Sequence, residues 1–160
     1  MAAGRTYGVE IRAAAPADAA DLALLLSKLG YPMSARAAAL RLEALARAPD
    51  SALMVAVGHA PVIGLVALHW CAMLQHDKPV ARITTLVVDD RERGRGIGRM
   101  LVKSASQIAR MAGCDVLELT TGLQREAAHA FCRSIGFTAS SLRFSRSLRR
   151  RPSGPAAGDL

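Results

Sequence analysis

A six-residue segment near the middle of the chain has the composition and spacing of an anion-binding loop. Arg-Gly-Arg-Gly-Ile-Gly occupies residues 93–98 and follows an apolar run that ends at Val88. Apolar residues then recur at helical spacing from Ile97, so a helix is expected to begin at the loop. The first N–H groups of a helix have no internal partners and carry the positive end of its dipole. They can therefore donate together to phosphate oxygens.

The glycines and arginines of this loop suit the same chemistry. Three glycines lack the Cβ atoms that would hold a phosphate away from the backbone, and these are Gly94, Gly96 and Gly98. Three arginines add positive charge beside them: Arg93, Arg95 and Arg99. The segment has neither the Gly-Lys-Ser/Thr of a P-loop nor the GxGxxG of a dinucleotide site. A flexible loop with a capping glycine is the plain alternative.

The length predicts one domain, and the basic charge allows a nucleotide phosphate, a nucleic acid or a membrane surface as a partner. The 160 residues are 51% hydrophobic and carry a formal net charge of +8, which favours anionic ligands.

The three cysteines form no CxxC pair, so neither a disulfide framework nor a metal site is expected. The longest nearly apolar stretch, 62–74, is too short to span a bilayer, and no apolar segment resembling a signal peptide is present. A cytoplasmic location without membrane association is therefore expected.

Local patterns around the loop predict ten elements in the order β-α-α-β-β-β-α-β-α-β, a sheet flanked by helices. Strands are expected at 9–12, 52–57, 62–68, 80–88, 116–120 and 142–148. Helices are expected from Pro16 to a stop at Gly30, from a Ser34 cap to a stop at Pro49, from Ile97 to Gly113, and over 125–134. Residues 1–8 are expected to be a flexible N-terminus, 9–148 the domain, and 149–160 a disordered basic tail.

Two motifs give the chain a family resemblance. Arg93-x-x-Gly96-x-Gly98 resembles the coenzyme A pyrophosphate signature of the GNAT superfamily of N-acetyltransferases, and 128–137 resembles that family's Ala-x-x-Phe/Leu-Tyr-x-x-x-Gly-Phe element. The resemblance covers roughly residues 9 to 148. It implies the GNAT fold, a mixed and mostly antiparallel sheet flanked by helices. It also implies acetyl-CoA as the cosubstrate, with no metal.

The resemblance assigns further residues to the coenzyme. The main-chain groups of Leu86, Val87 and Val88 are expected to pair with the pantetheine arm, because this strand splays from its neighbour in the family. Their side chains can pack in the core at the same time. Arg125 stands where many relatives carry an Asn that contacts the arm. It could reach a phosphate or the substrate, or it could be a solvated first-turn arginine.

The groups that would move protons are less evident. Cys132 stands where relatives often have the Tyr that protonates the departing thiolate; a thiol could donate that proton, or it could be a small buried hydrophobe. The strand of Thr84 and Thr85 offers no base where many relatives have a Glu. Three side chains elsewhere could act as the general base: Glu118, His69 and His76. A water relay could also take this role.

The expected activity is acetyl transfer from acetyl-CoA to a primary amine of a small molecule or a protein, by direct attack in a ternary complex. A GNAT-fold protein that binds coenzyme A as a sensor or partner remains an alternative. Nucleic-acid binding is not expected, because the basic residues lack interleaved aromatics for base stacking. A homodimer is possible, but the sequence shows no interface.

Overall fold

The computed structural model describes residues 8–59 and 61–149, which form two compact units divided between Arg125 and Glu126. The first unit contains five strands: β1 (Glu10–Ala13), β2 (Ser51–Val57), β3 (Val62–Cys71), β4 (Val80–Val88) and β5 (Val116–Leu119). Its helices are α1 (Ala19–Lys28), α2 (Ala35–Arg47), α3 (Ile97–Met111) and the short 3₁₀ turns η1 (Pro16–Asp18) and η2 (Asp90–Glu92). The second unit contains α4 (Glu126–Ser134).

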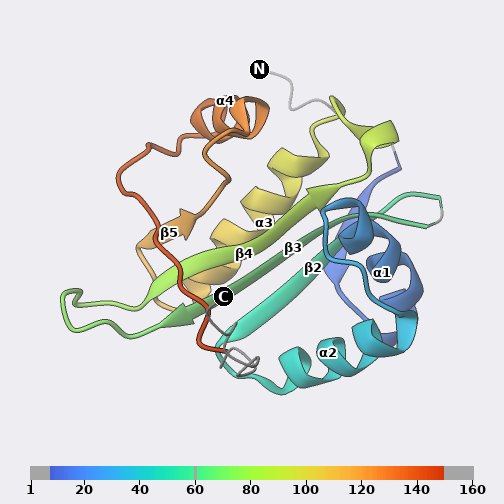
Figure 1. Ribbon diagram of the computed structural model, residues 1–160, viewed down its shortest axis with the longest axis horizontal. Coiled ribbons are helices and arrows are strands. Elements are labelled where there is room, and N and C mark those ends of the chain that lie inside the picture. Colours follow the sequence, from blue (N-terminus) through green and yellow to red (C-terminus); the bar gives the residue numbers. More distant parts are fainter. Residues whose placement is uncertain (1–7, 60, 150–160) are drawn as a thin grey trace, which may run out of the picture. The chain divides into compact units, whose positions relative to one another are not determined.

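The five strands form one sheet in the order β1-β2-β3-β4-β5 (Figure 1). The first three neighbouring pairs are antiparallel, and β4 with β5 is parallel. The crossover that a parallel pair requires is supplied by α3. This arrangement confirms the expected mixed, mostly antiparallel α/β sheet.

Helices cover both faces of the sheet. Leu65 of β3 packs in one hydrophobic cluster with Leu22 and Leu25 of α1 and with Leu42 of α2. A Cβ added to Gly64 would instead meet α3, so the side chains of β3 alternate between the α1/α2 face and the α3 face. Because β3 is central and covered on both faces, residues 62–68 are all buried, which explains their continuous apolar run.

Local sequence signals set the helix ends. The hydroxyl of Ser34 accepts from the Ala37 N–H at 3.1 Å, which confirms the predicted cap of α2. At the end of α3, the N–H groups of Gly113 and Cys114 donate back to the carbonyls of Arg110 and Ala109 at 3.0 and 2.9 Å. This is the Schellman pattern, in which a residue of positive φ closes the last turn.

The strand expected at 142–148 is wrong, because residues 138–149 adopt no regular structure. The apolar residues that suggested it are exposed, Leu142 at 69%, Phe144 at 90% and Leu148 at 85%. Arg146 also interrupts their alternation, so the segment lacks a continuous apolar face to bury.

The expected flexible N-terminus and disordered tail lie almost entirely outside the described residues, which begin at Gly8 and end at Arg149. Among the helices of the described residues, none is long and apolar enough to cross a membrane.

Candidate functional site

The glycine loop connects the end of β4 to the start of α3. After Val88 the chain passes through η2 and Arg93, and Gly96 then stands at the N-cap of α3 with φ of 78°. Gly94 has a similar φ of 77°. An L side chain rarely adopts this conformation. A Cβ at either glycine would meet no atom of the chain within 4 Å, so the space beside both is open to a ligand.

Positive charge and helix polarity converge on this open space. The first turn of α3 contains no acidic residue, so nothing on the helix opposes an anion at its N-terminus. Arg93 pairs with Asp90 at 2.7 Å, and Arg95 pairs with Glu92. Both guanidinium groups remain partly exposed, at 69% and 46%, and can turn toward a phosphate.

The β4 strand has an unpaired edge beside this loop. Its pairing with β5 covers Val80 to Ile83 and stops there, where Ile83 lies opposite Leu119. The rest of β4 continues toward the loop with no strand on that side in the described chain (Figure 1). A bulge in the pairing with β3, where Thr84 has no opposite residue, coincides with the end of the β5 contact. Bulges bend a strand and end its pairing.

Hydrogen-bond alternation shows which main-chain groups face the open edge. The Asp89 N–H donates to the Ile63 carbonyl of β3 at 2.8 Å. Main-chain groups alternate in direction along a strand, so those of Val87 also face β3. Those of Leu86 and Val88 face the open side. The sequence predicted that the main-chain groups of Leu86, Val87 and Val88 would all be available to the pantetheine arm. In the structure only those of Leu86 and Val88 face the open side.

Asp89 attaches the loop to the body of the unit, a contact that sequence reasoning missed. Its carboxylate accepts from Lys28 Nζ at 2.9 Å and from the Arg91 N–H at 3.0 Å. The bond from Lys28, followed by that from the Arg91 N–H, lowers the pKa of Asp89 to about 2. Lysines are common in the last turn of a helix, where they interact favourably with the helix dipole. The position of Lys28 therefore gave no sign that it contacts a residue 61 positions away.

Cys132 lies in α4 of the second unit. This helix ends in a Schellman motif, in which Phe137 and Gly136 donate to the carbonyls of Cys132 and Arg133 at 3.0 and 3.1 Å. The Gly-Phe pair of the sequence motif is therefore the C-cap of α4. The Cys132 side chain is half-buried, and this burial raises the pKa of its thiol. The thiol is accordingly protonated at neutral pH.

The other sequence candidates are distributed over the first unit. Arg125 lies just before α4, where its N–H donates to the Gly122 carbonyl at 3.1 Å and its side chain is exposed. Glu118 on β5 accepts from Arg82 of β4 at 2.8 Å. His69 lies opposite Arg82 on β3, whereas His76 lies in the β3–β4 loop.

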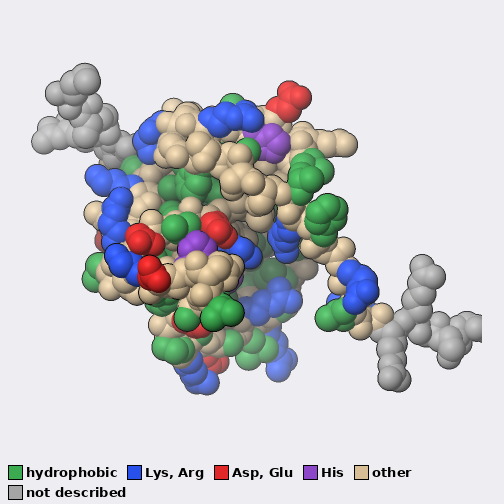
Figure 2. All heavy atoms as spheres, turned by 90° about the vertical axis from the view of Figure 1, so that its left-hand side faces the viewer, with side chains coloured by type: hydrophobic (Ala, Val, Ile, Leu, Met, Phe, Trp, Pro, Cys, Tyr) green, Lys and Arg blue, Asp and Glu red, His purple; other side chains and the backbone are tan. Residues whose placement is uncertain are grey.

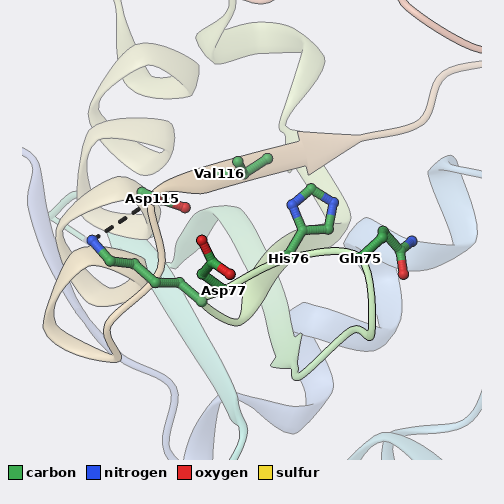
Figure 3. Close-up of a pocket in the computed structure, with 6 residues that line it drawn as sticks. Gln75, His76, Asp77, Asp115 and Val116 are labelled. Atoms are coloured by element: carbon green, nitrogen blue, oxygen red, sulfur yellow. Dashed lines mark ion pairs between the residues drawn. The ribbon is translucent and has the colours of Figure 1, made fainter.

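His76 lines a polar pocket of about 510 Å³ (Figure 3). Its other residues come from the same loop and the start of β5: Gln75, Asp77, Lys78, Asp115 and Val116. In Figure 2, acidic side chains and a histidine gather on the face that carries this loop. The pocket residue Lys78 lies just before β4, and the glycine loop begins after η2, beyond the other end of β4. Because β4 has 9 residues, its two ends are roughly 26 Å apart at about 3.3 Å per residue.

Metal-binding side chains do not gather in the part of the chain that the structure describes, where no three His, Cys, Asp or Glu residues are placed to hold an ion. The donors near the glycine loop are instead main-chain N–H groups and guanidinium groups, which suit an anionic ligand.

Comparison with known proteins identifies the family. Residues 22–137 match the Acetyltransferase (GNAT) family. The chain is 34% identical over 100 residues to an aminoalkylphosphonate N-acetyltransferase from Salmonella typhimurium, a match that covers 62% of this chain and 65% of that relative. The chain thus spans slightly less than two thirds of that relative's length.

Solved structures share the fold over nearly their whole length. An acetyltransferase from Trypanosoma brucei superposes with a TM-score of 0.75 at 25% identity, over 88% of this chain and 99% of that one. A transcriptional regulator from Bacillus halodurans gives a TM-score of 0.81 at 23% identity over the same shares, a likeness of fold alone. With its glycine loop and open β4 edge within the matched residues, this chain belongs to the GNAT family of acetyltransferases.

Proposed function

We propose that the protein transfers an acetyl group from acetyl-CoA to a primary amine. The observation that carries this proposal is the open edge of β4, from which the chain passes through η2 to the glycine loop at the start of α3. Acetyl-CoA suits these two features, because it has a pyrophosphate for the glycine loop and an amide-containing arm that can hydrogen-bond to the strand edge. The loop would hold the pyrophosphate, while Leu86 and Val88 would hydrogen-bond the arm.

The chain's own groups account for binding and orientation. The N–H groups at the start of α3 would donate to the pyrophosphate, and Arg93, Arg95 and Arg99 would neutralise its charge. A free N–H on β4 would polarise the thioester carbonyl, a role that needs no special side chain. Val87 would hold the strand in place through its bonds to β3.

Proton balance places two further demands on the site. Nitrogen attack forms the C–N bond and breaks the C–S bond; one proton leaves to a base or water, and another reaches the departing thiolate. Cys132 remains a candidate for the second transfer. Its raised pKa keeps the proton available but makes the thiol a weaker donor.

The Salmonella relative is named for aminoalkylphosphonates, so these compounds are the first acceptors to test. A protein amine remains in the panel, because the matched residues cover only part of that relative.

The test separates donor binding from turnover. Calorimetry with coenzyme A and acetyl-CoA measures binding, and thiol release in the presence of an amine panel measures transfer. Gly96→Val should abolish coenzyme binding, because a branched side chain would have to adopt a φ of 78° and would occupy the ligand space. Arg93→Gln should weaken binding without affecting the fold, since Arg93 is exposed. Gly58→Ala is the matched control, because its new Cβ would meet one side-chain atom at an ordinary 3.7 Å.

Each outcome decides between the functions. Binding together with thiol release on at least one amine supports the enzyme. Tight binding with no thiol release on any amine would favour the sensor. Absence of coenzyme binding by the wild type would contradict both.

A further inference from the structure

Four polar side chains form a row across the sheet, on the face that also carries α1 and α2. The pairing register places Ser51 opposite His69, His69 opposite Arg82, and Arg82 opposite Glu118. His69 lies four residues from Leu65, which packs against α1 and α2, so both side chains point to that face. Directly opposite residues on neighbouring strands share a face, so the whole row lies there.

The two charged members of this row are held together and remain open to solvent. Arg82 donates from Nε and Nη2 to a single oxygen of Glu118, Oε2, at 3.3 and 2.8 Å. A guanidinium group has five N–H donors, so Arg82 keeps Nη1 for another partner, and Glu118 keeps Oε1. Their side chains are 46% and 40% exposed. The helices on this face therefore do not cover them.

The row lies beside the point where the sheet opens. Ile83 and Leu119 form the last β4–β5 pair, and Arg82 and Glu118 form the pair before it. At about 3.3 Å per residue, the charged pair is within roughly 7 Å of the opening along the strands. On the opposite face α3 covers the unpaired part of β4, because its Ile97 and Leu101 lie beside Gly64, the residue opposite Val88. An acceptor can therefore approach the opening from the face of the row.

We propose that Arg82 and Glu118 bind the acceptor, and that the acceptor is a small zwitterion, an amine that also carries a phosphonate or carboxylate group. The free oxygen of Glu118 accepts from the ammonium group, while the free nitrogen of Arg82 donates to the acid group. One cation and one anion fixed side by side are complementary to such a molecule, and a simple monoamine uses only half of the site. This inference rests on the proposed acetyl transfer at the β4 opening.

The experiment compares acceptors that differ only in their acid group. Thiol release is measured as kcat/KM for 2-aminoethylphosphonate and β-alanine against ethanolamine and propylamine. The wild type should prefer the zwitterions. Arg82→Gln should lower their kcat/KM at least about tenfold more than that of the monoamines, which corresponds to one charge-assisted contact. Arg82→Lys should retain part of the preference, because it keeps the charge but loses the planar fork.

Two controls separate recognition from a structural role of the pair. Arg47→Gln breaks an exposed Arg–Glu pair on α2, whose atoms are 2.5 Å apart, and should leave the acceptor preference unchanged. The coenzyme A dissociation constant of Arg82→Gln should also match that of the wild type. Equal losses for zwitterions and monoamines in Arg82→Gln would overturn the inference and leave the pair as a link between β4 and β5.

Binding of the acceptor without turnover distinguishes this inference from the proposed function. Titration of 2-aminoethylphosphonate into the coenzyme A complex reports binding directly. Arg82-dependent binding with no thiol release would support the zwitterion site and contradict acetyl transfer. Thiol release on monoamines alone would support acetyl transfer and contradict the zwitterion site.

Discussion

At the scale of single residues, Asp89 controls the direction in which the chain leaves β4. Asp89→Asn keeps the shape of the side chain but removes the charge that attracts Lys28 Nζ at 2.9 Å. The loop should then sample more conformations, and coenzyme A binding should weaken roughly fivefold, the factor that about one capping bond contributes. Calorimetric titration measures this change.

Lys28→Met is the companion to Asp89→Asn, because it removes the same ion pair from the other side. It should weaken binding by a similar or smaller factor, since the Arg91 N–H still holds Asp89. Glu43→Gln on α2 alters an exposed ion pair elsewhere and should have no effect. Unchanged coenzyme affinity in Asp89→Asn would show that the loop keeps its conformation without this contact.

Cys132 provides a second prediction at this scale. Burial raises the pKa of its thiol, which disfavours the thiolate that a covalent acetyl-cysteine would require. Cys132→Ala should therefore reduce kcat less than about tenfold, which is below the roughly 10²–10⁴-fold that a working general acid contributes, and leave coenzyme binding intact. A loss of several orders of magnitude in kcat with normal binding would instead make Cys132 the principal acid.

At the scale of elements, the contact between β3 and α3 positions the donor site. A Cβ at Gly64 would lie 3.0 Å from Leu101 Cδ1, 3.2 Å from the Val87 carbonyl oxygen and 3.4 Å from Ile97 Cγ2. Gly64→Ala should therefore push α3 away from the sheet and destabilise the protein by about 1–3 kcal/mol. Because Ile97 begins α3 and Val87 lies on β4, coenzyme affinity should fall as well.

Thermal unfolding and calorimetry together check the Gly64 prediction. The expected loss in Tm is roughly 3–10 °C for a chain of this size. Gly58→Ala should change Tm by less than about 2 °C, because its Cβ meets Ile63 Cδ1 at an ordinary 3.7 Å. A Gly64→Ala protein with wild-type Tm and coenzyme affinity would mean that α3 shifts without cost.

Element types were predictable from sequence where a periodic pattern and its stop signals agreed. The Ser34 cap and the Gly113 stop both lie where they were expected. The strand predicted at 142–148 is wrong because Arg146 interrupts its apolar residues, which leaves no continuous apolar face to bury. Strand β3 runs to Cys71 rather than Leu68, since its final residues pair with the start of β4.

The candidate site was predictable to the extent that it is local in sequence. The glycine loop is one continuous segment, so its place before α3 followed from spacing. The narrowing to Leu86 and Val88 required the hydrogen-bond alternation with β3, and the Arg82–Glu118 pair required the strand order. Both depend on register, which no periodicity in one segment determines.

At the scale of the whole molecule, the carboxylates of Asp18 and Asp89 should determine the pH below which the free energy of unfolding falls. Asp18 is 5% exposed and accepts a bidentate pair of bonds from Arg12, both at 2.8 Å, and one from the Ala15 N–H at 2.7 Å. The bond from Arg12 is the main reason that the pKa of Asp18 is lowered, although burial opposes it. Asp89 adds a second lowered pKa, at about 2.

The sign of the pH dependence follows from these lowered pKa values. A carboxylate whose folded pKa lies below its unfolded value of about 3.9 stabilises the fold at higher pH. That contribution is complete above about pH 5 and is lost as the pH falls from about 4 through the folded pKa. The contribution of these two carboxylates to the free energy of unfolding should therefore be constant near neutral pH and fall steeply below about pH 4.

Asp18→Asn tests whether this carboxylate joins β1 to the start of α1 through its charge. At pH 7 the variant should lose about 1.5–3 kcal/mol, the usual range for hydrogen bonds to a charged group. Urea unfolding at pH 7, 4 and 2.5 should show the gap between wild type and variant closing as Asp18 of the wild type is protonated. Glu43→Gln, which alters an exposed pair, should follow the wild type at each pH. A gap of constant size from pH 7 to 2.5 would mean that shape and packing at Asp18, rather than its ionisation, hold these two elements together.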